Sequence, residues 1–273
     1  MDLEQLQIQL SQHPKALGVL APFWRVRPRF QLHWQYCVDS TNRELWCLIE
    51  SEAPAGSVFM ASTQSSGRGQ WGRRWESPPG GLYLSLGLKP NMPAHHGPYF
   101  TLASSCGLVT SLRNLGILAQ VKWPNDIVVH GKKLGGLLTE TRMERGIIKD
   151  VVIGLGLNGF NPVPCTGTSI AHCIRPDLSL SPLNTLEGLA AIALYGLLQG
   201  YLYWKNYGNQ ALLNAYRSCM ANIGQMITVN DNPARIIGVA ASGNLQVQSV
   251  SGQRQFAKTL EIEPGKVTLG YNA

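Results

Sequence analysis

The stretch QVKWPNDIVVHGKKLGGLLTET, residues 120–141, combines two strand-like runs with a sharp bend and a turn. A first strand delivers Lys122 and Trp123, and Pro124 favours extended geometry for the residue before it. Apolar residues resume after the bend, and the turn at residues 130–132 leads into the second strand-like run. Taken alone, KWPND is better explained as a surface turn with a solvated lysine. Its neighbours in the chain have to decide between the two interpretations.

Glycines interrupt the strands that follow this bend. Gly135 and Gly136 lie inside a strand-like run, where glycine weakens a sheet unless something must approach it closely. A second set, GLGLNGFN at residues 154–161, follows at the end of another strand. It is weak support for a dinucleotide-binding turn, because no helical pattern follows and the third glycine spacing is missing. We therefore expect a sheet surface open to a ligand, and no dinucleotide fold.

A basic loop precedes these strands. GRGQWGRRW, residues 67–75, holds three arginines and three glycines, and it joins the strand-like runs SVFMAS (57–62) and GLYLSLGL (81–88). Glycine lets the backbone approach a ligand, and arginine offers a planar fork of donors that suits phosphate or carboxylate. The loop, called the basic loop below, predicts an anionic ligand.

The rest of the chain alternates helical and strand-like segments. A strand over residues 32–38 leads into a helix for which Thr41 and Glu44 form a capping-box signature. The last fifty or so residues form a series of short alternating strands, as in a small barrel. Helical spacing of apolar residues predicts further helices over residues 2–12, 99–115, 185–207 and 209–219.

Composition limits the class of protein. The chain has 273 residues, of which 44% are hydrophobic, so it can bury a real core. The formal charge of +7 suits an anionic ligand or a nucleic acid, but only 14% of residues are charged and no long basic run occurs. Six scattered cysteines without a C-x-x-C pair predict mostly buried thiols in a reduced, cytoplasmic protein. No leader peptide and no apolar segment of membrane-spanning length is seen, so we expect no membrane association.

The ordered motifs S-T-N, Q-x-x-G-R-G-x-x-G-R-x-W, K-W-P-N-D, K-L-G-G and G-L-G-L-N resemble those of biotin protein ligase, the biotin-acetyl-CoA-carboxylase ligase family. The resemblance covers residues 32–273. It implies an α+β fold: a mixed-sheet catalytic core like class II aminoacyl-tRNA synthetases and lipoate ligases, followed by a small SH3-like β-barrel. The expected divisions are an N-terminal extension (1–30), a biotin- and ATP-binding catalytic domain (31–221) and the SH3-like domain (222–273).

The first thirty residues are too short for an independent helix-turn-helix domain, so we expect a short form of the family without sequence-specific DNA binding. The implied reaction joins biotin and MgATP into biotinyl-5'-AMP and then transfers biotin to a lysine of a biotin carboxyl carrier domain of acetyl-CoA carboxylase. ATP, magnesium and biotin enter as substrates, with no tightly bound prosthetic group, and the enzyme would be a monomer or homodimer. A lipoate-protein ligase and a basic nucleic-acid-binding module stay open as alternatives.

The resemblance also implies site residues. Biotin is a neutral bicycle with polar ureido atoms, so its pocket needs uncharged donors and acceptors. A lysine between the biotin carboxylate and the α-phosphate would offset the repulsion of two anions. The implied biotin-binding residues are Ser40, Thr41, Asn42, Gln64, Gly67, Arg68, Gly69, Lys133, Gly135 and Gly136. The implied ATP-binding residues are Arg73, Trp75, Lys122, Asn125 and Asn158, and the implied catalytic residues are Lys133, Arg68 and Asp126, with Asp126 also a magnesium ligand.

Simpler interpretations accompany several of these residues. Helix capping accounts for Thr41 or Ser40 as well as ligand binding does, and solvent exposure accounts for Arg74. Lys132 fits a solvated turn lysine. The basic loop departs from the more familiar family form G-R-G-R-x-G-R in carrying Gln70 where arginine is usual.

Overall fold

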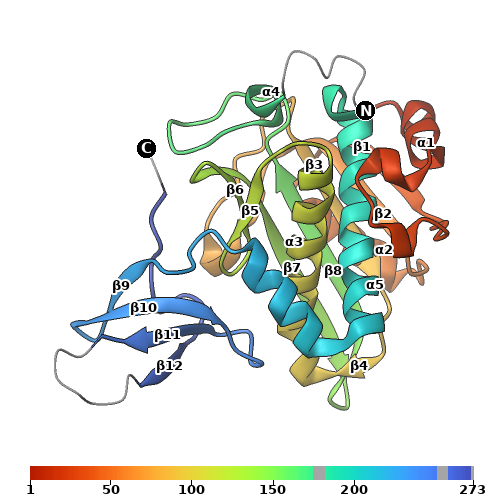
Figure 1. Cartoon of the computed structure of the whole chain (residues 1–273). Coiled ribbons are helices and arrows are strands. Elements are labelled where there is room, and N and C mark those ends of the chain that lie inside the picture. Colours follow the sequence, from red (N-terminus) through yellow and green to blue (C-terminus); the bar gives the residue numbers. More distant parts are fainter. Residues whose placement is uncertain (175–181, 251–257, 272–273) are drawn as a thin grey trace.

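A computed structural model describes residues 1–174, 182–250 and 258–271 (Figure 1). The part of the predicted C-terminal barrel at residues 251–257 lies outside the described residues. Within the described ranges, a large sheet of eight strands forms the centre, with strand order β1-β2-β3-β8-β7-β6-β5 and with β4 paired to β8. The strands are β1 (Gln31–Val38), β2 (Ser57–Gln64), β3 (Leu82–Leu88), β4 (Met92–Pro93), β5 (Ala119–Lys122), β6 (Asp126–Val129), β7 (Lys132–Glu144) and β8 (Ile147–Leu157).

The large sheet is mixed. β1 and β2 run parallel because the helix α2 (Thr41–Glu50) carries the chain from one to the other. The remaining neighbours are antiparallel, and β6 and β7 are joined through the left-handed residues His130 and Gly131, which confirms the predicted hairpin turn. The α+β class with a mixed sheet is therefore confirmed.

Helices cover both faces of the sheet, and the alternation of side chains along β2 shows how. Val58 and Met60 point into the main core beneath α3 (Gly97–Asn114) and α5 (Leu186–Cys219), whereas Phe59 and Ala61 pack with Leu45 of α2 in a smaller cluster. Successive residues of a strand face opposite sides, so one strand serves both layers.

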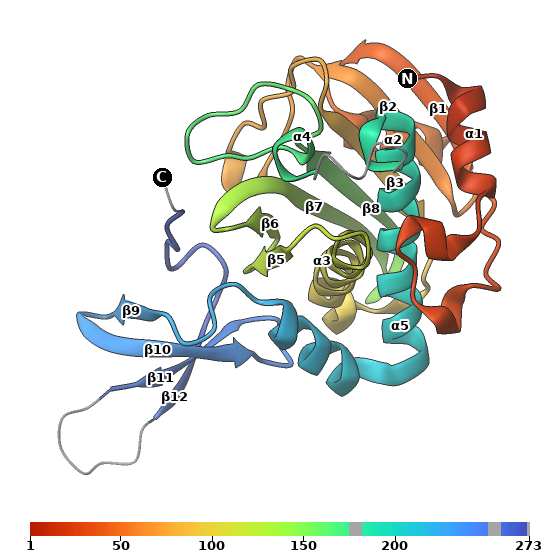
Figure 2. The ribbon, with the colours of Figure 1, turned by 45° about the horizontal axis from the view of Figure 1, so that its top comes forward.

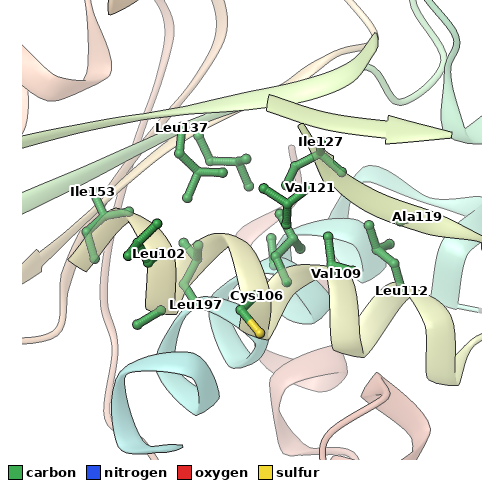
Figure 3. Packing of buried hydrophobic residues seen from close by; sticks show 14 of the residues in the cluster. Leu102, Cys106, Val109, Leu112, Ala119, Val121, Ile127, Leu137, Ile153 and Leu197 are labelled. Atoms are coloured by element: carbon green, nitrogen blue, oxygen red, sulfur yellow. The ribbon is translucent and has the colours of Figure 1, made fainter. Parts of the chain in front are cut away.

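The main core lies between the sheet and α3, which runs beside α5 (Figure 2). Figure 3 shows Leu102, Cys106 and Val109 of α3 facing Leu137 and Ile153 of the sheet. The expected helix over residues 99–115 and the two expected helices at 185–207 and 209–219 are confirmed, since Gly208 interrupts α5 with φ 81° and ψ 178°.

The first thirty residues pack against α5. Asp2 caps α1 (Leu3–Ser11) by accepting from the backbone N–H groups of the next turn, and Leu6 is fully buried. The backbone N–H of Leu20 donates to Gln199 of α5 at 3.0 Å. The other short elements are the 3-10 turns Pro14–Leu17, Ala21–Phe23, Gln70–Gly72, Ala94–His96 and Pro182–Asn184, and α4 (Ile170–Cys173).

A second, antiparallel sheet follows α5, with the order β12-β11-β10-β9. Its strands are β9 (Met226–Val229), β10 (Asn232–Val239), β11 (Leu245–Ser249) and β12 (Thr259–Ile262). It fits the predicted SH3-like domain and lies beside β5 and the end of α5 (Figure 2). The indole N–H of Trp123 ties the two sheets together by donating to the carbonyl of Gly243 at 3.0 Å.

One expectation about the cysteines is wrong. Cys37, Cys47 and Cys165 are exposed, and only Cys106 and Cys219 are fully buried, where α3 meets the end of α5. Cys37 and Cys47 lie on an edge strand and on the outer helix α2, where the core does not enclose them. Within the described residues, no helix is long and apolar enough to cross a membrane.

Candidate active site

A cavity of about 600 Å³ opens where the basic loop, the start of α2, the β5–β6 bend and strands β7 and β8 meet. Residues 264–271, which follow β12, form its remaining wall. The predicted site residues that line it are Ser40, Thr41, Asn42, Gln64, Arg68, Gly69, Arg73, Trp75, Lys122, Asn125, Asp126, Lys133 and Gly136. The fold thus brings motifs from five separate stretches of chain to one place, although their roles toward ligands stay predictions.

Charged groups gather at one end of the cavity. Lys133 Nζ lies 2.7 Å from Asp126 Oδ1, and the lysine side chain is 31% exposed, so its ammonium still reaches the cavity. Lys122 and Arg73 face the same space. Three cations around one carboxylate leave a net positive field, which attracts an anion.

Lys122 is the most perturbed of these cations. Its side chain sits at the end of β5 and the residue is only 7% exposed. The pKa of Lys122 is lowered to about 8, mainly by burial; the charges of Lys133 and Arg73 also lower it, and the charge of Asp126 opposes them. At neutral pH the ammonium is therefore mostly charged but poorly hydrated, which strengthens its attraction for an incoming anion.

A second cluster at the cavity wall, called the neutral end of the cavity below, consists of hydrogen-bonded neutral polar groups. Gln64 Oε1 accepts from the backbone N–H of Thr41 at 2.9 Å and from its hydroxyl at 3.3 Å. The buried hydroxyl of Ser85 lies 2.8 Å from Thr41 Oγ1 and 2.6 Å from Asn42 Oδ1. This network fixes hydroxyl and amide groups of α2 and β2 beside the cavity, where they can hydrogen-bond an uncharged polar ligand.

The predicted capping box at the start of α2 is wrong. Ser40 is the N-cap residue, yet its side chain makes no capping bond, and Thr41 is already helical. The Thr41 hydroxyl instead forms hydrogen bonds with the side chains of Gln64 and Ser85. Contacts across the sheet override the local cap, and the role of Thr41 toward a ligand stays a prediction.

Arg68 of the basic loop pairs with Glu140 of β7. The other oxygen of Glu140 accepts from Asn42 Nδ2 at 2.8 Å and from Trp46 Nε1 at 3.2 Å. Because the Arg68 side chain is half exposed, the pair is screened by solvent and can open at small cost. Arg68 is thereby linked to the neutral end of the cavity through one carboxylate.

Trp75 lies across the glycines of the sheet. A side-chain carbon on Gly156 would come within 2.3 Å of the Trp75 ring, and one on Gly136 within 3.6 Å. Glycine at these positions therefore makes room for the indole, as expected from their unusual place in strands. The Trp75 indole nitrogen is buried and has no hydrogen-bond partner within the described ranges.

The main chain of Lys133 is held independently of its side chain. Its N–H donates to Thr166 at 2.9 Å, and its carbonyl accepts from Thr168 at 2.8 Å. Asn158 Nδ2 donates to the Thr168 carbonyl at 3.1 Å. Asn158 does not line the cavity, so the predicted contact with adenine has no direct support in its position.

Two further predicted residues lie outside the cavity wall. Gly67 sits in the loop, where an added side-chain carbon would meet the Trp75 carbonyl at 2.5 Å. A side-chain carbon added to Gly135 would lie 2.7 Å from the carbonyl oxygen of Gly156. Both glycines allow close backbone packing behind the site, and their predicted contact with biotin stays a prediction.

Three residues of the site were not found from the sequence. Ser85 is a polar residue inside the apolar run GLYLSLGL, which was a usable signal, and Glu140 stands in the strand after KLGG. Tyr271 lies far from every motif, and no local pattern marks it. Its hydroxyl donates to Asp126 Oδ2.

The cavity offers few side chains that could bind a magnesium ion. Among residues 1–174, 182–250 and 258–271 no group of three or more histidine, cysteine, aspartate or glutamate side chains is placed to hold a metal ion. Mg²⁺ commonly reaches a site with substrate phosphates and one or two carboxylates. Asp126 is a single carboxylate on the cavity wall, which is compatible with that kind of coordination. Its role as a magnesium ligand stays a prediction.

Residues 34–158 match the model of the Biotin/lipoate A/B protein ligase family. These residues are therefore similar to the ligase domain of that family, and they are called the ligase domain below. This ligase domain contains most of the cavity-lining residues, including the basic loop and the Lys133–Asp126 pair.

Individual relatives agree with this assignment. The chain is 27% identical over 242 residues to the biotin–[acetyl-CoA-carboxylase] ligase of Paracoccus denitrificans, covering 82% of this chain and 96% of that one. It is 37% identical over 129 residues to the bifunctional ligase/repressor BirA of Bacillus spizizenii, covering 46% of this chain and 40% of the relative. The chain thus spans about two-fifths of the length of such ligase/repressors.

The fold of a solved relative is similar. The biotin protein ligase of Aquifex aeolicus in complex with biotin and ATP superposes with a TM-score of 0.62 at 23% identity, covering 89% of this chain and 99% of that one. At this identity the likeness establishes the fold, and the expected catalytic core with a following small domain is confirmed at that level.

Proposed function

We propose that this chain is an ATP-dependent biotin protein ligase. The observation that carries the proposal is the two-ended cavity: neutral hydroxyl and amide groups at one end and the Lys133–Asp126 pair with Lys122 at the other. Biotin has a neutral polar bicycle at one end and a carboxylate at the other, so its two ends match the two ends of the cavity. The names of the relatives support the same substrate pair, biotin and ATP.

In the first half-reaction, a biotin carboxylate oxygen attacks the α-phosphorus of ATP, the bond to the β-phosphate breaks, and pyrophosphate leaves. Two anions must approach each other for this step. At 4 Å they repel by about 4 kcal/mol at an effective dielectric constant near 20. Lys133, whose ammonium reaches the cavity from a fixed main chain, would lie between them and stabilise the charge that develops.

Other groups bind the nucleotide. Lys122 and Arg73 would hold the phosphates, and Trp75 would offer its ring to the adenine. When bound with ATP, magnesium supplies charge neutralisation on the phosphates. Arg68, released from Glu140, would close the basic loop over the product adenylate.

In the second half-reaction, the neutral amine of an acceptor lysine attacks the carbonyl carbon of biotinyl-5'-AMP and forms an amide. The bond between that carbon and the phosphate oxygen breaks, AMP leaves with the bonding electrons, and the nitrogen gives up a proton to solvent. The proposed acceptor is a biotin carboxyl carrier domain of acetyl-CoA carboxylase, and the name of the Paracoccus relative includes that carboxylase. Asp126 would orient the amine; its position on the cavity wall next to Lys133 supports this role.

A lipoate ligase is the nearest alternative, because the family model covers both activities. The dithiolane of lipoate offers no hydrogen-bonding amide, so it would gain no hydrogen bonds from the polar groups around Thr41 and Ser85. Each hydrogen bond that biotin gains there is worth about 0.5–1.5 kcal/mol. The neutral polar end of the cavity therefore favours biotin.

The test is exchange of labelled pyrophosphate into ATP, with biotin or lipoate as the acid, followed by intact-mass analysis of a purified carrier domain. We expect exchange with biotin alone and one added biotinyl group on the carrier. Exchange with lipoate alone would establish the lipoate ligase. Exchange with neither acid, combined with salt-sensitive nucleic-acid binding, would replace the enzyme by the nucleic-acid-binding alternative.

A further inference from the structure

The segment after β12 runs back to the cavity of the ligase domain. Residues 264–271 line one wall of it. Near the start of this segment, a side-chain carbon on Gly265 would lie 3.2 Å from the ring of Trp71 in the basic loop. At its end stands Tyr271. The C-terminal part of the chain thus contributes to the site at two places.

Tyr271 contacts the charged end of the cavity with both its hydroxyl and its ring. The hydroxyl donates to Asp126 Oδ2, while Lys133 occupies Oδ1 of the same carboxylate. Lys122 Nζ lies 3.2 Å from the centroid of the Tyr271 ring, and Lys133 Nζ lies 5.8 Å from it. One side chain therefore touches or faces all three charged residues.

Each contact has a definite physical effect. Burial and the charge of Asp126 raise the pKa of Tyr271, so the phenol keeps its proton and donates it to the carboxylate. The donated hydrogen bond fixes the plane of the Asp126 carboxylate, which in turn fixes Lys133. The ring covers the Lys122 ammonium, excludes water from it and replaces part of its hydration by a cation–π contact.

We propose that Tyr271 is a positioning residue for the adenylation step: its hydroxyl orients the Asp126–Lys133 pair and its ring sets the environment of Lys122. This inference rests on the proposed ligase function and adds a group from outside the ligase domain to its site. Two variants separate the two roles. Tyr271→Phe keeps the ring and removes the hydroxyl, whereas Tyr271→Leu removes both.

The first experiment needs no substrate. The reactivity of Lys122 toward acetic anhydride is followed by mass spectrometry across a pH series in wild type, Tyr271→Phe and Tyr271→Leu. The groups that face Lys122 are Asp126, Lys133, Arg73 and Tyr271 itself. We expect a midpoint near pH 8 in wild type and in the Phe variant. In the Leu variant water reaches the ammonium, so the midpoint moves up toward that of an ordinary lysine.

The second experiment measures pyrophosphate exchange in the same three proteins, with Tyr36→Leu as a control. Tyr36 is 66% exposed on β1 and takes no part in the cavity. We expect Tyr271→Phe to lower kcat about tenfold, the usual effect of losing one hydrogen bond to a charged group, with KM for ATP nearly unchanged. Tyr271→Leu should lower kcat further and also shift the pH at which KM for ATP begins to rise.

The outcomes are separable. If wild type shows no biotin-dependent exchange, the ligase proposal fails, while the Lys122 labelling still reports on Tyr271. If labelling midpoints are identical in all three proteins and kcat is unchanged in both variants, Tyr271 positions nothing and the inference is overturned. Tighter ATP binding in either variant would also overturn it, because Tyr271 would then be a plug that ATP displaces.

Discussion

Replacing Lys133 by alanine removes the ammonium that we propose to lie between the two anions of the adenylation step. The repulsion of two unit charges at 4 Å is about 4 kcal/mol at an effective dielectric constant near 20, and each 1.36 kcal/mol corresponds to a tenfold change in rate. Loss of the whole effect would slow adenylation about a thousandfold. Lys122 and Arg73 remain in the cavity and offset part of it, so we expect a decrease of about a hundredfold to a thousandfold.

The fold should tolerate this change. The Lys133 side chain is 31% exposed, so its ion pair with Asp126 contributes no more than about 1 kcal/mol to stability. Its main-chain bonds to the loop at residues 166–168 do not involve the side chain.

The assay is biotin-dependent exchange of labelled pyrophosphate into ATP, with thermal unfolding measured on the same samples. Lys132→Ala is the matched control, because Lys132 is the neighbouring residue of β7 and does not line the cavity. We expect wild-type exchange in the control. A Lys133→Ala protein that is folded and exchanges pyrophosphate within threefold of wild type would refute the assignment of Lys133.

Four further predictions follow from the site. Ser85→Ala removes the hydroxyl between the two polar residues of α2, so KM for biotin should rise about tenfold while KM for ATP stays within twofold; equal effects on both would contradict the two-ended cavity. The pKa of Lys122 near 8 means that its charge is lost above that pH, so KM for ATP should be flat below pH 7.5 and rise above pH 8, and Lys122→Arg should flatten the profile. Trp123→Phe removes the hydrogen bond from the indole to the Gly243 carbonyl and should lower the free energy of unfolding. Trp34→Phe is the control, since the Trp34 indole nitrogen has no partner among the described residues. The decrease should be about 1–3 kcal/mol larger for Trp123→Phe than for Trp34→Phe. Gln70→Arg adds a charge to the cavity wall and should slow dissociation of biotinyl-5'-AMP by up to about tenfold; an unchanged dissociation rate would mean that this position acts through its backbone alone.

Much of the fold was predictable because hydrophobic periodicity dominates its core. The helix α3 and the two halves of α5 follow apolar spacing closely, and Gly208 marked the break between the halves. The hairpin of β6 and β7 followed from its turn residues. In each case the local pattern and the tertiary packing favour the same structure.

The start of α2 could not be predicted correctly from local rules. The pattern at Thr41 and Glu44 favours a capping box, but Thr41 bonds instead to Gln64 and to Ser85 on neighbouring strands. These partners are 23 and 44 residues away in the chain. A local pattern carries no information about contacts of that range, and the tertiary contacts outweighed the cap.

The site divides in a similar way. Lys122, Asp126 and Lys133 stand in compact motifs, so the resemblance of the sequence located them, and the structure brings them together. Tyr271 enters the site only because the chain returns to it after the C-terminal sheet, 145 residues beyond Asp126. Asn158, by contrast, stands in a motif but lies behind the cavity, where it supports the loop that holds Lys133.

The central claim is that this cavity joins biotin to the α-phosphate of ATP. The most direct measurement is mass spectrometry of the small molecules that stay bound after the protein is incubated with biotin and MgATP and no acceptor. We predict biotinyl-5'-AMP at close to one equivalent per chain in wild type, and a trace in Lys133→Ala. Recovery of unreacted biotin and ATP from folded wild-type protein, or of lipoyl-AMP alone when lipoate is supplied beside biotin, would contradict the account.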